Sequence, residues 1–96
     1  SVAMIARAVY SWMFGIRFTL NNVEIAPCLP ERYGNASVQF SYGKTRVAVT
    51  YKGYGAKVRS AMLDGKSVCT QNGIMIDKDY FANKEKVNIT VCMENE

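Results

Sequence analysis

From residue 23 onward, apolar residues recur at every second position, which is the period of a β-strand with one buried face. The alternating sets lie in separate short segments: Val23 and Ile25; Val38, Phe40 and Tyr42; Val47, Val49 and Tyr51; Val87, Ile89, Val91 and Met93. Two further short strands are expected at residues 58–63 and around residues 74–76. We therefore predict a mainly β chain, an antiparallel β-sandwich of jelly-roll type with roughly six or seven strands.

Turn-forming residues separate these segments. Gly43-Lys44 stands between two alternating sets and predicts a two-residue hairpin turn. Asp64-Gly65 predicts a second hairpin, because a type I′ turn requires positive φ at both central positions. Pro27 and Pro30 end the strand before them, and residues 51–55 break the alternation. The β part of the chain thus contains no linker and reads as one unit.

Residues 2–14 predict one N-terminal α-helix, because alanines favour it, no proline interrupts it and Gly15 follows as a stop signal. Its large apolar residues cover most of the circumference: Met4, Ile5, Val9, Trp12, Met13 and Phe14. A helix that is apolar on all sides is buried on several sides. The rest of the chain can cover one side of it, so we expect this helix to pack against neighbours that the chain does not contain.

Composition excludes several classes of function. The chain has 96 residues and a formal charge of +4, so we expect one small domain. It contains no histidine, which excludes Ser-His-Asp and Cys-His nucleophile pairs and His-ligated zinc. The basic residues are scattered without a nucleic-acid-binding motif, and the apolar N-terminal stretch is shorter than the about 20 residues that span a bilayer. We expect no nucleic-acid partner, no membrane, no metal and no cofactor.

Cysteine usage bears on the compartment. Cys28, Cys69 and Cys92 are far apart in the sequence, and an odd number cannot form a complete disulfide framework. We expect buried, reduced thiols and a cytoplasmic protein. One disulfide with one free thiol is the alternative.

Tyrosines and a pair of aspartates are the candidate site residues. Tyr51 and Tyr54, with Tyr33 nearby, offer rings that could stack on sugars, although cross-strand packing explains such rings equally well. Asp77 and Asp79 would share a face at about 7 Å on a strand, near the separation of a carboxylate pair in an inverting glycosidase. We favour a solvated turn there, because catalytic carboxylates converge from separate elements.

Four segments in order resemble the C-terminal region of glycoside hydrolase family 94, which comprises cellobiose, cellodextrin and chitobiose phosphorylases and related cyclic glucan synthases. These segments are WMFGIR at residues 12–17, VEIAPCLP at residues 23–30, the strand start at residues 37–40, and the strand and Asp-Gly hairpin at residues 58–66. The resemblance covers most of residues 1–93.

This resemblance implies an enzyme whose (α/α)6 barrel carries catalysis and is followed by a small β-sandwich. Residues 1–17 would be the last barrel helix, and residues 18–96 the C-terminal β-sandwich domain. In such enzymes an Asp acts as general acid and phosphate attacks the anomeric carbon, and that Asp would lie upstream of this chain. Ser1 would correspond to a segment close to the phosphate site.

We therefore expect a fragment without catalytic residues, with a structural role as a domain that packs on the barrel. Its partners would be that barrel and, in a homodimer, a second copy. Two alternatives remain open: a free-standing carbohydrate-binding module that uses Tyr51 and Tyr54, and the tail of another six-hairpin glycosidase.

Overall fold

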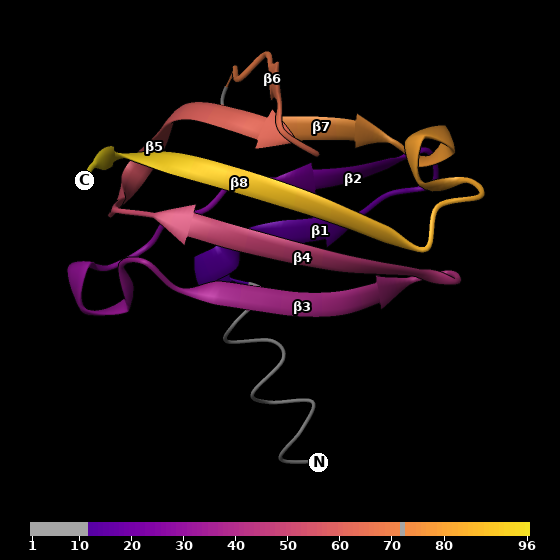
Figure 1. Ribbon diagram of the computed structural model, residues 1–96. Coiled ribbons are helices and arrows are strands. Elements are labelled where there is room, and N and C mark those ends of the chain that lie inside the picture. Colours follow the sequence, from indigo (N-terminus) through magenta and orange to yellow (C-terminus); the bar gives the residue numbers. More distant parts are fainter. Residues whose placement is uncertain (1–11, 72) are drawn as a thin grey trace.

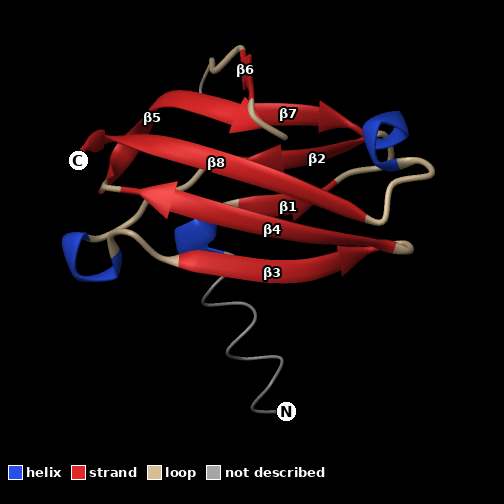
Figure 2. Cartoon of the chain, viewed as in Figure 1, coloured by secondary structure: helices blue, strands red, loops and turns tan. Residues whose placement is uncertain are grey.

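The computed structural model describes residues 12–71 and 73–96, and this part of the chain is a mainly β structure of two sheets (Figures 1 and 2). The strands are β1 Ile16–Phe18, β2 Asn22–Ile25, β3 Ser37–Tyr42, β4 Thr45–Lys52, β5 Tyr54–Leu63, β6 Lys66–Val68, β7 Ile74–Asp77 and β8 Lys86–Asn95. Two short 3₁₀-helices, η1 Glu31–Tyr33 and η2 Lys78–Phe81, lie between strands.

The smaller sheet has the order β1-β2-β7, and the larger has the order β3-β4-β8-β5-β6. All pairs are antiparallel except β4 and β8, which run parallel from Arg46 beside Lys86 to Lys52 beside Cys92. The expectation of antiparallel pairing throughout is therefore wrong at the centre of the larger sheet. The reason is visible in Figure 1: β7 and η2 carry the chain to the end where β4 begins, so β8 starts there and runs in the same direction.

The two inner faces form one apolar core, as the alternating pattern predicted. The inward residues of β4 and β8 are almost wholly buried, and Ile25, Ile74 and Ile76 of the smaller sheet pack with them in the same cluster. Outward residues of the same strands are polar or half-exposed, so each strand buries a single face. A two-sheet, sandwich-like arrangement is thus established.

At the N-terminal side, Trp12–Phe14 form a helical turn, and the remainder of the predicted helix lies outside the described residues. Met13 and Phe14 of this turn are buried, whereas the Trp12 side chain is 70% exposed. Gly15 then adopts φ of 66°, and a Cβ there would lie 2.1 Å from the carbonyl oxygen of Ala26. Only glycine permits this approach, which places Ile16 opposite Ile25 in the sheet.

The turns agree with their sequence signals. Gly43 and Lys44 join β3 to β4, and Asp64 and Gly65, with φ of 50° and 84°, join β5 to β6. Gly53, with φ of 80°, separates β4 from β5 at the point where the alternation breaks. The hairpin predictions are therefore confirmed.

All three cysteines carry free thiols, but the expectation that they are buried is wrong. Cys28 and Cys69 are exposed, and Cys92 is half-buried. Cys92 lies between Val91 and Met93 on β8, whose side chains face the core, so the alternation directs Cys92 outward. Within residues 12–71 and 73–96, no helix has the length and apolarity needed to cross a membrane.

Candidate functional site

Tyr51 lies in the core rather than on the surface. Its side chain is fully buried, its ring stacks on Phe14 with centroids 5.1 Å apart, and its hydroxyl donates to the Phe14 carbonyl oxygen at 2.8 Å. Burial raises the pKa of the Tyr51 hydroxyl above its usual value of 10.0. The ring presents no face to solvent, so the assignment of Tyr51 as a sugar-stacking residue is wrong. The alternation that directs Val47 and Val49 inward directs Tyr51 inward as well.

The other candidate residues are not gathered into one site. Tyr54 is half-buried at the start of β5. Tyr33, in η1, is 38% exposed, and the guanidinium of Arg32 lies 5.0 Å from its ring centroid. Ser1, the candidate beside a phosphate, lies outside the described residues. The structure therefore does not bring Tyr51 and Tyr54 together as an aromatic platform.

Asp77 and Asp79 form a turn, as favoured from the sequence. Asp77 precedes η2, and its Oδ1 accepts a hydrogen bond from the Asp79 backbone N–H at 2.8 Å. The Asp77 side chain thus caps a 3₁₀-helix, and both residues are exposed. In the part of the chain that the structure describes, no cluster of three or more Cys, Asp or Glu side chains is suited to holding a metal ion.

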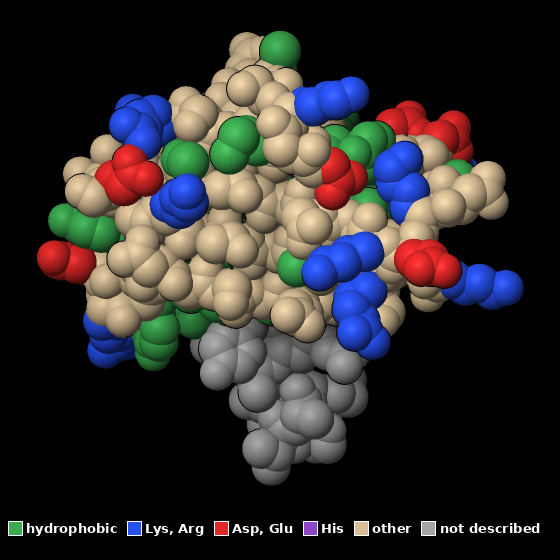
Figure 3. Space-filling view, in the orientation of Figure 1, with side chains coloured by type: hydrophobic (Ala, Val, Ile, Leu, Met, Phe, Trp, Pro, Cys, Tyr) green, Lys and Arg blue, Asp and Glu red, His purple; other side chains and the backbone are tan. Residues whose placement is uncertain are grey.

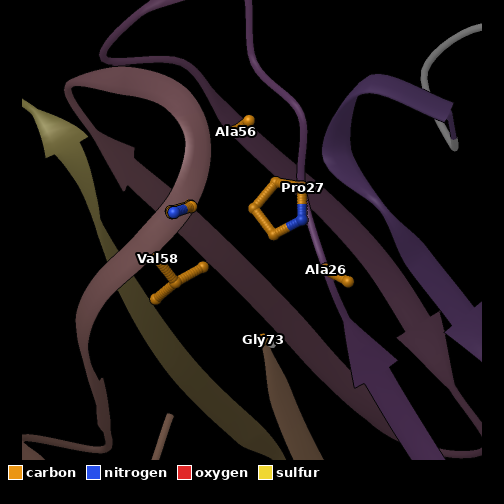
Figure 4. A pocket seen from close by; sticks show the side chains of 6 residues that line it. Ala26, Pro27, Ala56, Val58 and Gly73 are labelled. Atoms are coloured by element: carbon orange, nitrogen blue, oxygen red, sulfur yellow. The ribbon is translucent and has the colours of Figure 1, made fainter. Parts of the chain in front are cut away.

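A first hollow, of about 370 Å³, lies where β2 ends and where β5 and β7 begin (Figure 4). Its lining is small and mostly apolar: Ala26, Pro27, Ala56, Lys57, Val58 and Gly73. Figure 4 shows Pro27 and Val58 on opposite sides of the space. Lys57 is the one ionisable side chain among these lining residues, so this hollow has no acid and base pair for catalysis.

A second hollow, of about 300 Å³, lies at the end of the molecule where β4 and β8 begin. We call it the basic hollow, because its lining includes three lysines: Tyr42, Gly43, Lys44, Thr45, Lys78, Phe81, Ala82, Asn83 and Lys84. None of these lining residues carries a carboxylate. No sequence motif indicated this site, since its lysines come from three separate segments.

The inner face of β3 is left partly uncovered. Its inward residues Val38, Phe40 and Tyr42 are only half-buried, whereas the inward residues of neighbouring β4 are buried. Phe18 of β1 is 53% exposed and packs its ring against Phe40 and Tyr42, at centroid distances of 5.4 and 5.7 Å. We call Phe18, Val38, Phe40 and Tyr42 the apolar flank.

The opposite side of the larger sheet contrasts with this flank. Its outer face, turned toward the viewer in Figure 3, consists mostly of uncharged polar side chains and backbone, with Lys and Arg toward both ends of the strands. Aligned rows such as Ser37, Thr50 and Thr90 make up this polar face. None of the exposed large apolar side chains of the described residues lies on a strand of the larger sheet. They are Trp12, Phe18, Leu20, Tyr33 and Met75.

Comparison with known proteins adds no identification. No family model matches the sequence, and no curated protein matches it. The apolar flank and the two hollows are thus the features on which a function can be argued.

Proposed function

We propose that this chain is the non-catalytic C-terminal β-domain of a carbohydrate-active enzyme of the family 94 phosphorylase type, and that its apolar flank packs against the catalytic (α/α)6 barrel. In this proposal the segment that ends at Phe14 completes the barrel as its last helix. Residues 16–96 form the jelly-roll-like terminal domain, because Ile16 and Arg17 belong to strand β1 and not to the helix that was expected to reach residue 17. The observation that carries the proposal is the apolar flank, together with the four sequence segments that resemble the family.

The architecture explains why the flank needs a partner. β1 has three residues and β3 has six, so the smaller sheet is too narrow to cover the inward side chains of β3. An aromatic cluster that a single domain leaves open is typical of a surface that another domain covers. Each Å² of apolar surface removed from water stabilises the assembly by about 25 cal/mol, so covering several half-exposed rings is a substantial gain.

The leading turn supports a helical neighbour next to this flank. Met13 and Phe14 anchor the turn in the core, while Trp12 projects outward with 70% of its side chain exposed. Trp12 lies four residues before β1, the strand that supplies Phe18 to the flank. A barrel that contacts Trp12 would therefore be well placed to cover Phe18. The free thiols accord with a reducing compartment such as the cytoplasm.

A domain exchange tests this function. The chain replaces the C-terminal domain of a cellobiose phosphorylase, and the chimera is assayed for phosphorolysis of cellobiose and for thermal unfolding. We expect an active, soluble chimera, no turnover by the chain alone, and a lower midpoint of unfolding with Phe18→Ser. Met75→Ser is the matched control, because Met75 is 66% exposed and lies opposite Glu24 on the outer face of the smaller sheet.

The outcome that contradicts the proposal is equally clear. A chimera that aggregates or lacks activity, while the chain alone is a stable monomer, would show that the flank does not fit such a barrel. If Phe18→Ser and Met75→Ser lowered the midpoint of unfolding of the chimera by the same amount, the apolar flank would have no specific role in docking.

A further inference from the structure

We propose that the basic hollow is a binding site for the phosphate group of a small ligand. This inference does not depend on the proposed docking role, because the lysines that carry it lie outside the apolar flank, and the two surfaces share only Tyr42. Three lysines on separate elements line one space: Lys44 in the β3–β4 turn, Lys78 at the start of η2 and Lys84 just before β8. Charge-assisted hydrogen bonds from lysine ammonium groups are a common means of holding phosphate.

The backbone beneath these lysines is fixed. Thr45 is buried, and its hydroxyl lies within hydrogen-bond distance of two carbonyl oxygens, 2.9 Å from that of Phe81 and 2.7 Å from that of Lys84. This shared hydrogen bond joins the first residue of β4 to the segment that carries Lys84. The Lys78 backbone N–H donates to the Asn21 carbonyl oxygen at 2.9 Å, which ties η2 to the turn before β2. The lysine-bearing segments are therefore held in place around the hollow.

Electrostatics at this end of the molecule favour an anion. The Lys84 ammonium lies 4.4 Å from the Tyr80 ring centroid, a cation–π contact, and within residues 12–71 and 73–96 it forms no ion pair with a carboxylate. On the adjoining strand starts, Arg46 pairs directly beside Lys86, and like charges in such a pair repel. The acids next to these lysines in the sequence are Asp77, Asp79 and Glu85. None of them lines the hollow, and Asp77 already accepts the Asp79 N–H. A bound dianion would relieve this excess of positive charge.

The size of the hollow indicates more than a bare ion. A water molecule takes up about 30 Å³ in the liquid, so a space of about 300 Å³ exceeds what one phosphate group needs. The Tyr42 ring, which packs against Phe81 at 4.9 Å, forms an apolar wall beside the lysines. A phosphate with a small organic group attached would match a cationic rim and an aromatic wall. Inorganic phosphate shares the same chemistry, and the experiment distinguishes the two sources.

The test is an NMR titration of the isotope-labelled full chain at low ionic strength, with inorganic phosphate in one series and glucose 1-phosphate in the other. We expect saturable shifts of the backbone amides in residues 42–45 and 78–84. Lys44→Gln with Lys78→Gln should weaken binding by about tenfold, because two charge-assisted contacts are lost. The control, Lys52→Gln with Lys57→Gln, changes the net charge equally and should alter binding by less than about twofold.

Each result decides the matter. Tighter binding of glucose 1-phosphate assigns the site to a phosphate monoester, and equal binding of both probes assigns it to inorganic phosphate. Equal weakening by the two double variants would overturn the proposal, because it would show attraction by net charge alone. Shifts that do not saturate, or that fall outside the two segments, would overturn it as well. All four lysines are exposed, so thermal unfolding should show that both variants fold as the parent does.

Discussion

The hydroxyl of Tyr51 donates a hydrogen bond of 2.8 Å to the carbonyl oxygen of Phe14, and the rings of the two residues stack at 5.1 Å. This pair joins β4, an inner strand of the larger sheet, to the helical turn that precedes β1. One buried tyrosine therefore anchors the N-terminal side of the described chain to the core.

The first prediction concerns Tyr51→Phe at neutral pH. The variant keeps the ring but loses the hydrogen bond to Phe14, so the free energy of unfolding should fall by about 1–2 kcal/mol. Chemical denaturation measures this change as a lower midpoint with an unchanged m-value. An unchanged midpoint would show that the hydrogen bond contributes nothing to stability.

The second prediction concerns alkaline pH. Burial raises the pKa of Tyr51 in the folded state above the 10.0 of an unfolded chain, so the unfolded state releases this proton first as the pH rises. Stability should therefore be complete below pH 10 and decline above it, with a slope of up to about 1.4 kcal/mol per pH unit from this group.

Tyr51→Phe should remove this component of the alkaline decline, as followed by denaturation at several pH values. A smaller decline should remain, since a hydrogen bond to Asp64 also raises the pKa of Tyr80. The matched control is Tyr33→Phe, which removes a hydroxyl from an exposed ring and should leave the profile unchanged. If Tyr51→Phe and the parent chain lost stability identically between neutral and alkaline pH, the deprotonation of Tyr51 would not contribute to that loss.

The third prediction is that Gly15→Ala destabilises the chain by roughly 2–4 kcal/mol, because the new Cβ meets the Ala26 backbone and the residue must keep a positive φ. The control is Gly43→Ala, at a turn where the φ is 60° but no atom lies within 4 Å of an added Cβ. Thermal unfolding should show a clearly larger loss for Gly15→Ala. Equal losses would mean that φ alone, rather than the close approach to Ala26, sets the requirement for glycine.

The fourth prediction is that Thr45→Val lowers the free energy of unfolding by about 1–3 kcal/mol. The carbonyl oxygens of Phe81 and Lys84 would lose the Thr45 hydroxyl as a hydrogen-bond donor. Thr50→Val, on the exposed face of the same strand, should change stability by less than about 0.5 kcal/mol. Equal values for the two variants would contradict the role given to the Thr45 hydroxyl.

The fifth prediction concerns the chain in isolation. With Phe18 and Trp12 exposed to water, the chain should self-associate at high concentration, and Phe18→Ser should shift it toward monomer in light scattering. Met75→Ser removes an apolar side chain that is more exposed than Phe18 from a different surface, and it should leave the association unchanged. A parent chain that stays monomeric at every concentration would argue against the apolar flank as a docking surface.

Local features of this fold could be predicted from the sequence, because short-range chemistry determines them. Alternation identified the buried faces of β4 and β8, and Asp64-Gly65 identified its hairpin. The same alternation places Tyr51 on the inward face of β4, whereas the aromatic side chain considered alone suggested a contact with sugar. Local pattern was the better guide there, since a residue two positions beyond an inward residue on the same strand shares its face, as Tyr51 does with Val49.

Long-range relationships could not be predicted in the same way. The parallel pairing of β4 with β8 depends on where β7 and η2 deliver the chain, and no turn residue encodes that. The basic hollow likewise depends on Thr45 joining β4 to residues 81–84, which are far from Lys44 in sequence. The apolar flank depends on the difference in width between the two sheets, which alternation within one strand does not report.

The position of β8 also governs the order in which this molecule can assemble. β8 is the last strand in the sequence, yet it lies in the middle of the larger sheet, between β4 and β5. A ribosome that has released everything up to residue 85 would hold a sheet divided into two halves with unpaired inner edges. Completion of the larger sheet therefore waits for residues 86–95, and a chain that stopped before them would lack an inner strand of the sheet and not an edge strand.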